Sequence, residues 1–295
     1  MNKLFFTFTA LKKDTLFTTR DIADYYNQTI NHYQNWWSLD NNLAVHYGIW
    51  DENTSNFQES LANTNKVLMD IADINSEEKI LDAGCGVGGS AFYLAKKMEA
   101  IVTGITLSEK QFAYATQKCK ELKLEDRVSF KIEDYTKTSF KNNSFDVIWA
   151  IESITSAPNK ANFAREANRL LKPGGRLIIA DYFKTSNNQH DPNKLLDKWR
   201  DLWSMADFVT TTDYKNIFNK NGFNVKSERD VTKEITPTAK RMYWSYLLGG
   251  PLAIIYNTFF NPQRFAKTHY KSGKYQYKAL KKGLWKYSII LFVKD

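Results

Sequence analysis

A glycine-rich segment, Ala83-Gly84-Cys85-Gly86-Val87-Gly88-Gly89, lies between a short apolar run, Lys79–Asp82, and a stretch with helical spacing, Ser90–Met98. Glycines let the backbone adopt positive φ angles and let a ligand approach the main chain closely. A strand, a turn of this kind and a helix N-terminus together form a cradle for nucleotide-like ligands. The segment therefore predicts the first strand–turn–helix unit of an α/β sheet.

Strand-like and helix-like patterns alternate after this turn. Short apolar runs predict further strands over Ile101–Ile105, Val128–Ile132, Phe145–Ile151 and Arg176–Ala180, and two more that start near Gly222–Phe223 and Trp285–Val293. Helical spacing between the runs predicts helices over Glu109–Leu122 and Lys160–Leu171. Strands that alternate with helices in this way indicate βαβ units and a parallel sheet. We therefore predict an α/β fold with a seven-stranded, mostly parallel sheet and helices on both faces.

The composition divides the chain into three segments. Residues 1–75 predict an N-terminal helical cap, residues 76–185 a ligand-binding core, and residues 186–295 a helical lid with the last strands of the sheet. In the third segment, Met242–Gln263 carries no charge and is interrupted by Gly249-Gly250-Pro251. We predict two short helices there that form an apolar lid over the crevice, with an interfacial membrane anchor as the alternative.

The net charge of +9 is concentrated at one end of the chain. Residues 1–234 hold 30 of the 41 Lys and Arg and 31 of the 32 Asp and Glu, a balance of −1. No acidic residue follows Glu234 until Asp295, and tyrosines and tryptophans are interleaved with the basic residues between them. Such a segment favours an anionic partner, such as a phosphorylated substrate or a membrane surface, although a solvated basic face fits as well. Nucleic acid is the least favoured partner, because no recognised nucleic-acid module accompanies the segment.

The cysteines and the N-terminus bear on the compartment. Two cysteines are too few for a disulfide framework, which predicts a reducing compartment, and no Cys/His cluster has metal-ligand spacing, so we expect no metal. The first apolar stretch is followed by Lys12, Lys13 and Asp14 and not by a small-residue cleavage site. We expect a cytoplasmic protein, with contact to a membrane periphery as a further expectation.

The glycine turn also satisfies G-x-G-x-x-G through Gly84, Gly86 and Gly89, as a dinucleotide-binding enzyme would. A NAD site places an acidic residue at the end of the second strand, about 20 residues further on. That end reads Gly104-Ile105-Thr106-Leu107-Ser108 and has no acid. Asp82 instead stands where a carboxylate can hold the cationic amino group of an amino-acid cofactor, so the pattern favours such a cofactor over NAD.

Residues 75–185 resemble the class I S-adenosylmethionine (SAM)-dependent methyltransferases, which have a Rossmann-like fold. Asp82-Ala83-Gly84-Cys85-Gly86 is similar to their first motif, Phe145-Asp146-Val147-Ile148 to their fourth strand, and Leu171-Lys172-Pro173-Gly174-Gly175-Arg176 to the turn into their fifth. The resemblance implies SAM as the cofactor, with its methionine part lined by Asp82, Gly84, Cys85 and Gly86. It also implies that Asp134 accepts from the adenine amino group and that Tyr135 flanks the base, while a loop-capping role for Asp134 stays open.

The end of the second strand narrows the resemblance to one branch of these enzymes. The run from Gly104 to Gln111 resembles the tocopherol, sterol and cyclopropane-fatty-acid methyltransferases, and so does His46-Tyr47-Gly48-Ile49-Trp50. By this resemblance the ribose and adenosine are held by Thr106, Leu107, Ser108 and Gln111, although Ser108 equally fits a helix cap. The N-terminal run lies beside cofactor and substrate in that branch, which implies Tyr47 at the cofactor and Trp50 at the substrate.

The catalytic expectations centre on Glu152, which follows the fourth strand at the edge where open α/β sheets form their crevice. The resemblance implies that Glu152 faces the substrate, and it adds Tyr25 and His46 to the catalytic set. Residues 47–189 contain no histidine, so a histidine base at the usual place in that branch is excluded. The candidates for contact with a phosphorylated acceptor are the C-terminal residues Arg264, His269 and Lys271.

These observations predict methylation of a small lipid-like or isoprenoid acceptor, at carbon. An alkene acceptor would develop positive charge, which aromatic faces stabilise and which a carboxylate such as Glu152 would stabilise or relieve by removing a proton. Three alternatives stay open: methylation of a polar amine or natural product at nitrogen or oxygen, a non-catalytic SAM-binding module, and an NAD(P)-dependent oxidoreductase. Homo-oligomerisation is a further expectation.

Overall fold

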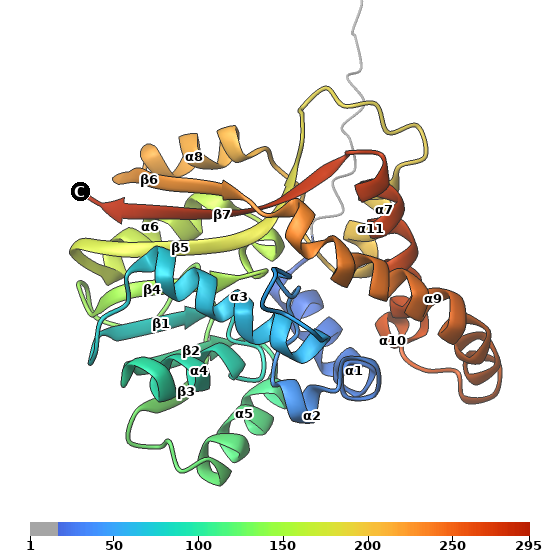
Figure 1. The fold of residues 1–295 in the computed structure, drawn as a ribbon, viewed down its shortest axis with the longest axis horizontal. Coiled ribbons are helices and arrows are strands. Elements are labelled where there is room, and N and C mark those ends of the chain that lie inside the picture. The colour runs from blue at the N-terminus through green and yellow to red at the C-terminus, as the bar shows by residue number, and fades with distance from the viewer. Residues whose placement is uncertain (1–16) are drawn as a thin grey trace, which may run out of the picture.

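The computed structural model describes residues 17–295, apart from the side chains of residues 35 and 36, and contains a seven-stranded sheet (Figure 1). Its strands are β1 Lys79–Ala83, β2 Ile101–Thr106, β3 Val128–Ile132, β4 Phe145–Ile151, β5 Leu171–Lys184, β6 Phe223–Asp230 and β7 Trp285–Lys294. They lie in the order β3-β2-β1-β4-β5-β7-β6, with parallel pairing from β3 to β5 and with β7 antiparallel to both its neighbours. The predicted fold class is confirmed.

The strand order places a crevice beside β1. The chain runs outward from β1 through β2 to β3 on one side, and through β4 to β5 on the other. At such a switch point the loops after neighbouring strands diverge, and ligands bind at the carboxyl ends of the strands. The glycine turn after β1, the end of β2 at Thr106 and Glu152 after β4 all lie at this edge.

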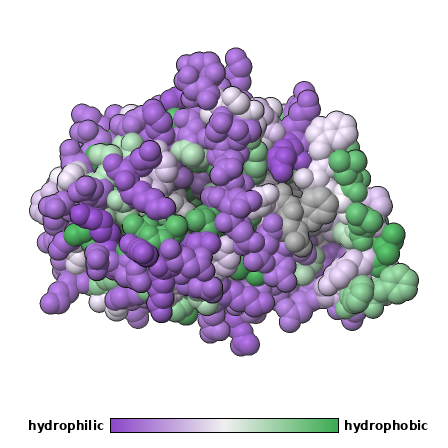
Figure 2. Space-filling model, turned by 60° about the horizontal axis from the view of Figure 1, so that its bottom comes forward, coloured by the Kyte–Doolittle hydropathy of each residue, from purple (hydrophilic) through white to green (hydrophobic). Residues whose placement is uncertain are grey.

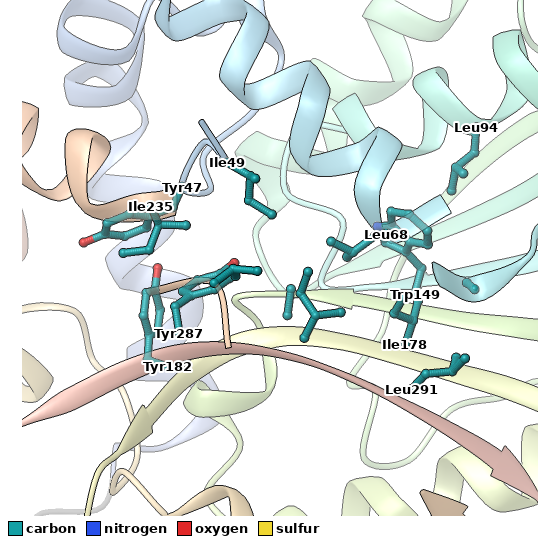
Figure 3. Packing of buried hydrophobic residues seen from close by; sticks show 14 of the residues in the cluster. Tyr47, Ile49, Leu68, Leu94, Trp149, Ile178, Tyr182, Ile235, Tyr287 and Leu291 are labelled. Atoms are coloured by element: carbon teal, nitrogen blue, oxygen red, sulfur yellow. The ribbon is translucent and has the colours of Figure 1, made fainter. Parts of the chain in front are cut away.

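Helices cover both faces of the sheet. They are α1 Thr19–Trp37, α2 Leu39–Asn42, α3 Phe57–Ala72, α4 Gly89–Met98, α5 Glu109–Glu121, α6 Lys160–Leu170, α7 Leu195–Leu202, α8 Thr211–Asn219, α9 Thr232–Phe260, α10 Arg264–Thr268 and α11 Ser272–Lys281. Successive strand residues point to opposite faces, so Trp149 joins the core beneath α3 and α4 while Ile148 joins the core beneath α6 and α8. Figure 3 shows Leu68 of α3 beside Trp149 and Ile178.

The N-terminal helices close over the carboxyl edge of the sheet. A capping box between Thr18 and Asp21 begins α1, which packs against α5 and α10. The chain then crosses the start of α4 so closely that a Cβ on Gly89 would lie 1.8 Å from the carbonyl oxygen of Leu43. Glycine at position 89 therefore lets the segment after α2 lie directly on the glycine turn that follows β1.

The prediction of two short helices within Met242–Gln263 is wrong. The single helix α9 runs through Pro251 as well as Pro237. A proline removes one intrahelical hydrogen bond and does not always end a helix. Here Gly249 and Gly250 are buried, and a Cβ added to Gly250 would lie 3.7 Å from the ring of Tyr270. Across residues 17–295, no helix is both long and apolar enough to cross a membrane.

The prediction of β5 as Arg176–Ala180 was too short. The strand continues to Lys184, because β7 pairs with every residue from Arg176 to Lys184 in antiparallel register. This extension carries Tyr182 beyond the ends of the parallel strands and places it opposite Tyr287. Both side chains thereby reach the edge at which the crevice opens.

Candidate functional site

A cavity with about 1040 Å³ of empty space, part of it open to solvent, lies at the carboxyl ends of the parallel strands. The predicted site residues that line it are Tyr25, His46, Asp82, Gly84, Cys85, Gly86, Thr106, Leu107, Gln111, Tyr135 and Glu152. The described residues of α9 do not line it, so the expected apolar lid over the crevice is not found in that helix.

The turn after β1 depends on glycine for two separate reasons. Gly84, Gly86 and Gly88 have φ angles of +88°, +54° and +88°, which side chains disfavour. A Cβ on Gly84 would also lie 2.4 Å from Cβ of Ser153, whose hydroxyl donates to the carbonyl oxygen of Ala83 at 2.6 Å. The turns after β1 and β4 are thereby fastened together at the floor of the cavity.

Gly84→Ala is expected to lower the free energy of unfolding by about 3 kcal/mol, through an unfavourable φ angle and the clash with Ser153. Gly174→Ala is the matched control, because Gly174 also has a positive φ angle but nothing lies within 4 Å of its added Cβ. This control is expected to cost about 1 kcal/mol. Urea unfolding measures both values, and equal losses would contradict the close packing of the two turns.

Asp82 places a buried carboxyl group at the cavity. Its side chain is 3% exposed, and its Oδ2 atom has no hydrogen-bond partner among the described residues. Burial raises the pKa of Asp82 to about 7. An isolated buried carboxylate is costly, and a cationic ligand group beside it would offset that cost. The N-terminus of α4, with its free N–H groups, adds a place for a ligand carboxylate.

An ammonium and a carboxylate on one carbon are what the methionine part of SAM presents. The unpartnered Asp82, the glycine turn and the start of α4 fit those two groups. The residues present at this end of the cavity therefore fit the cofactor that the sequence resemblance implies.

At the end of β2, Thr106 and Gln111 face the cavity while Ser108 does not. The Thr106 hydroxyl donates to Oε1 of Gln111 at 2.8 Å. Ser108 caps α5, since the backbone N–H of Gln111 donates to its Oγ at 3.1 Å, and its own hydroxyl donates to Asn27 at 2.6 Å. Its place is the helix cap that the sequence left open as an alternative.

At the end of β3, the neighbours of Asp134 line the cavity in its place. Oδ1 of Asp134 accepts hydrogen bonds from the backbone N–H and the hydroxyl of Thr136, as a loop-capping carboxylate does. Glu133 and Tyr135 are the lining residues, and the Tyr135 hydroxyl donates to the carbonyl oxygen of Ser153 at 2.9 Å. The adenine role predicted for Asp134 stays a prediction.

Glu152 is held by three donors from three parts of the chain. Its Oε1 accepts from the backbone N–H of Tyr47 at 2.6 Å and from the Tyr287 hydroxyl at 2.9 Å, and its Oε2 accepts from the Tyr182 hydroxyl. Burial raises the pKa of Glu152 to about 8, and the three hydrogen bonds oppose that rise. A carboxyl group with this pKa can exchange a proton near neutral pH.

Sequence reasoning did not find Tyr182 or Tyr287. Figure 3 shows both side by side with Tyr47, and each ring lies within 6.0 Å of the others between centroids. Tyr182 follows the fifth predicted strand, so its place at a strand end was a usable signal. Tyr287 lies on an antiparallel strand, and its alignment with Tyr182 depends on a register that the sequence pattern does not specify.

Tyr25 and His46 stand on the cap side of the cavity. The Tyr25 hydroxyl shares a 3.1 Å hydrogen bond with that of Tyr33. His46 Nδ1 lies 2.9 Å from the carbonyl oxygen of Tyr47, which can only accept, so Nδ1 carries the proton. Nε2 is then an acceptor, and it is buried without a partner in the described part of the chain. Burial lowers the pKa of His46 to about 4.

Five other predicted residues lie away from the cavity lining. The Tyr47 ring packs among Tyr182, Trp285 and Tyr287, so Tyr47 meets the site through its backbone. The Trp50 indole donates to Thr238 at 3.0 Å. The C-terminal candidates contact other rings: Arg264 that of Phe265, Lys271 that of Tyr270, and His269 those of His32, Tyr25 and Tyr33. Their substrate roles stay predictions.

The sequence and the fold of this chain are similar to those of known methyltransferases. Residues 74–222 match the family described as "Methyltransferase domain". Methyltransferase GfsG from Streptomyces halstedii is 33% identical over 75% of this chain and 78% of its own length. Tocopherol O-methyltransferase from Arabidopsis thaliana is 28% identical over 74% of this chain and 67% of its own length.

Among solved structures, geranyl diphosphate C-methyltransferase from Streptomyces coelicolor A3(2), in complex with Mg²⁺, geranyl-S-thiolodiphosphate and S-adenosyl-L-homocysteine, has the same fold. The TM-score is 0.77 at 20% identity, over 94% of this chain and 98% of that one. The family match covers half of the chain, and the sequence match to GfsG covers most of both proteins. The chain therefore belongs to the family of SAM-dependent methyltransferases.

Proposed function

We propose that this enzyme transfers a methyl group from SAM to an apolar, lipid-like or isoprenoid acceptor, at a carbon atom. The observation that carries the proposal is Glu152, a partly buried carboxyl group that lines the cavity, has a pKa of about 8, and is held by two tyrosine hydroxyls and a backbone N–H. Carbon methylation of an alkene leaves a positive charge on the acceptor. It requires a protein group that stabilises this charge and then accepts the proton that the acceptor loses. Glu152 meets both requirements.

When bound, SAM supplies a methyl group on a positively charged sulfur. The residues of the chain then have three tasks: to hold the donor, to hold the acceptor in line with it, and to keep water out. Asp82 and the start of α4 hold the amino-acid end. Thr106, Leu107 and Gln111 lie where the ribose and adenosine are expected. Glu152 takes up the proton that the acceptor loses, on a carboxylate oxygen that Tyr182 or Tyr287 already orients.

The acceptor end of the cavity is aromatic. The cavity lining includes Tyr25, Tyr26 and Tyr33 of α1, together with Tyr182 and Trp203. Aromatic faces bind apolar chains and stabilise developing positive charge. The names of related proteins agree with such an acceptor, because they include tocopherol and sterol methyltransferases.

The proposal is tested by incubating the protein with methyl-labelled SAM and a panel of prenyl diphosphates, prenylquinols, sterols and unsaturated phospholipids. Mass spectrometry identifies the labelled product, and nuclear magnetic resonance places the methyl group on carbon, oxygen or nitrogen. We expect a carbon-methylated product from an apolar acceptor. Transfer only to polar amines would contradict the proposal.

His46 supports oxygen methylation as a second candidate function. His46 lines the same cavity, and its buried Nε2 has no partner among the described residues, so it is free to accept a hydrogen bond from an acceptor hydroxyl. In that case His46→Ala is expected to reduce transfer to a hydroxylated acceptor by about tenfold, while transfer to an alkene is unchanged. The acceptor panel decides between the two candidates.

A further inference from the structure

The distal half of α9 carries an unusual concentration of exposed apolar side chains. Among the described residues, nine of the twelve large hydrophobic side chains that are exposed belong to this helix: Trp244, Leu247, Leu248, Leu252, Ile254, Ile255, Tyr256, Phe259 and Phe260. Phe259 is 78% exposed and Leu248 is 71% exposed. In Figure 1 the helix extends outward from the sheet, and Figure 2 shows apolar side chains gathered at that end of the molecule.

Exposed apolar surface of this extent marks a binding surface on a soluble domain. A helix that is apolar on all sides is stable only when something apolar surrounds it. The distal half of α9 is apolar on several sides at once, and it projects as a tip rather than lying in a groove. The surface therefore calls for a partner that is apolar and can close around a protruding helix.

The charges beside this helix point to an anionic partner. No charged residue lies between Arg241 and Arg264, and the flanking positions are basic: Lys240 and Arg241 before the tip, and Arg264, Lys267, Lys271 and Lys274 after it. Lys240 and Lys267 are exposed. An apolar tip surrounded by basic residues is complementary to a bilayer, whose acyl region is apolar and whose anionic headgroups are negative.

A second copy of the chain fits this surface less well. A symmetric dimer joins the same patch from both copies, and it would bring together the basic residues that flank the helix tip in each copy. Like charges brought together at an interface oppose association.

We propose that the distal half of α9 inserts into the headgroup layer of an anionic membrane. The fourteen residues Leu247–Phe260 rise about 21 Å, which is too short to cross a bilayer core of about 30 Å.

A single segment, His269–Lys271, lies between the inserted helix and residues that line the cavity. The segment His269–Lys271 packs against α9, and the ring of His269 lies 5.3 Å from that of Tyr33 and 5.8 Å from that of Tyr25 between centroids. Both tyrosines line the cavity. Docking in this orientation would bring the aromatic end of the cavity close to membrane-dissolved acceptors, a consequence that rests on the proposed function. The docking itself does not depend on methyl transfer.

Vesicle sedimentation tests the docking without any measurement of activity. The full chain is mixed with phosphatidylcholine vesicles, or with vesicles of phosphatidylcholine and phosphatidylserine in equal parts, and the pelleted fraction is measured. We expect binding to the anionic vesicles that weakens with added salt. Leu252→Ser combined with Phe259→Ser should weaken it at least about tenfold, and Lys240→Glu combined with Lys267→Glu about tenfold.

Two matched controls separate docking from general surface effects. Ile101→Ser with Val225→Ser removes exposed apolar side chains elsewhere, and Lys96→Glu with Lys97→Glu reverses two exposed charges on α4. Both should bind as the unchanged protein does, and circular dichroism verifies that every variant is folded. Three results would overturn the proposal: no binding to anionic vesicles, full binding by the apolar variant, or a dimer in sedimentation velocity that only the apolar variant dissociates.

Discussion

Glu152→Gln is expected to lower turnover by about a thousandfold while leaving cofactor affinity unchanged. Glutamine has nearly the same shape, and its carbonyl oxygen can still accept from the backbone N–H of Tyr47 and from Tyr287. The substitution therefore removes the charge and the proton acceptor and little else. Single-turnover rates with labelled SAM, together with calorimetric titration of S-adenosylhomocysteine, measure the two quantities separately.

The control for this variant is Glu166→Gln. Glu166 is also a partly buried carboxylate that accepts several hydrogen bonds, from Thr138 and Arg169, but it lies on α6 outside the cavity lining. We expect a modest loss of stability and no loss of turnover. Comparable loss of turnover in both variants would show that Glu152 acts through stability and not through the reaction.

The pH dependence of turnover follows from the same carboxyl group. The pKa of Glu152 is raised to about 8, and the ionised form is the one that accepts a proton, so turnover should rise with pH and level off above about 8. Tyr287→Phe removes a donor that favours the ionised form, which should raise the pKa further and move the profile to higher pH. Glu152→Gln should abolish this dependence.

Asp82→Asn is expected to weaken the affinity for SAM and S-adenosylhomocysteine by about a hundredfold, because a charge-assisted hydrogen bond to an ammonium is lost. The variant should be at least as stable as the unchanged protein, since it removes a buried charge whose Oδ2 has no partner in the described structure. Calorimetric titration and thermal unfolding measure these two opposite effects.

The affinity should also depend on pH. The raised pKa of about 7 means that Asp82 must lose a proton before it can hold an ammonium at lower pH. Affinity should therefore fall by up to about tenfold per pH unit below 7 in the unchanged protein, and not in Asp82→Asn. The control is Asp181→Asn. Asp181 accepts hydrogen bonds from the backbone N–H and the hydroxyl of Thr155, so this substitution should lower the stability and leave the affinity for the cofactor unchanged.

The sheet and the glycine turn after β1 were predictable because local patterns determine them. The strand Val128–Ile132 lies where its apolar run predicted it, and Ser108 caps α5, which was the alternative left open for it. The glycine turn combines positive φ angles with close approach of neighbouring chain, and both properties are visible as glycines in the sequence. Each of these features depends on residues within a few positions of one another.

The surroundings of Glu152 were less predictable because distant segments form them. The donors to Glu152 come from Tyr47, Tyr182 and Tyr287, which the sheet register and the N-terminal crossing bring together. The local pattern also misled at α9, where Pro251 suggested a break in what is one helix. His269 was predicted to contact a phosphorylated acceptor, and its ring packs against rings on α1, which the local sequence pattern did not indicate.

Calorimetric titration of the full chain with S-adenosylhomocysteine and, separately, with NADH tests the central claim most directly. That claim is that the turn after β1, with Asp82, holds the amino-acid end of a SAM-type cofactor. We predict saturable binding of S-adenosylhomocysteine at a single site, weakened about a hundredfold in Asp82→Asn, and no heat of binding from NADH. Binding of NADH alone, or no binding of S-adenosylhomocysteine at millimolar concentration, would contradict it.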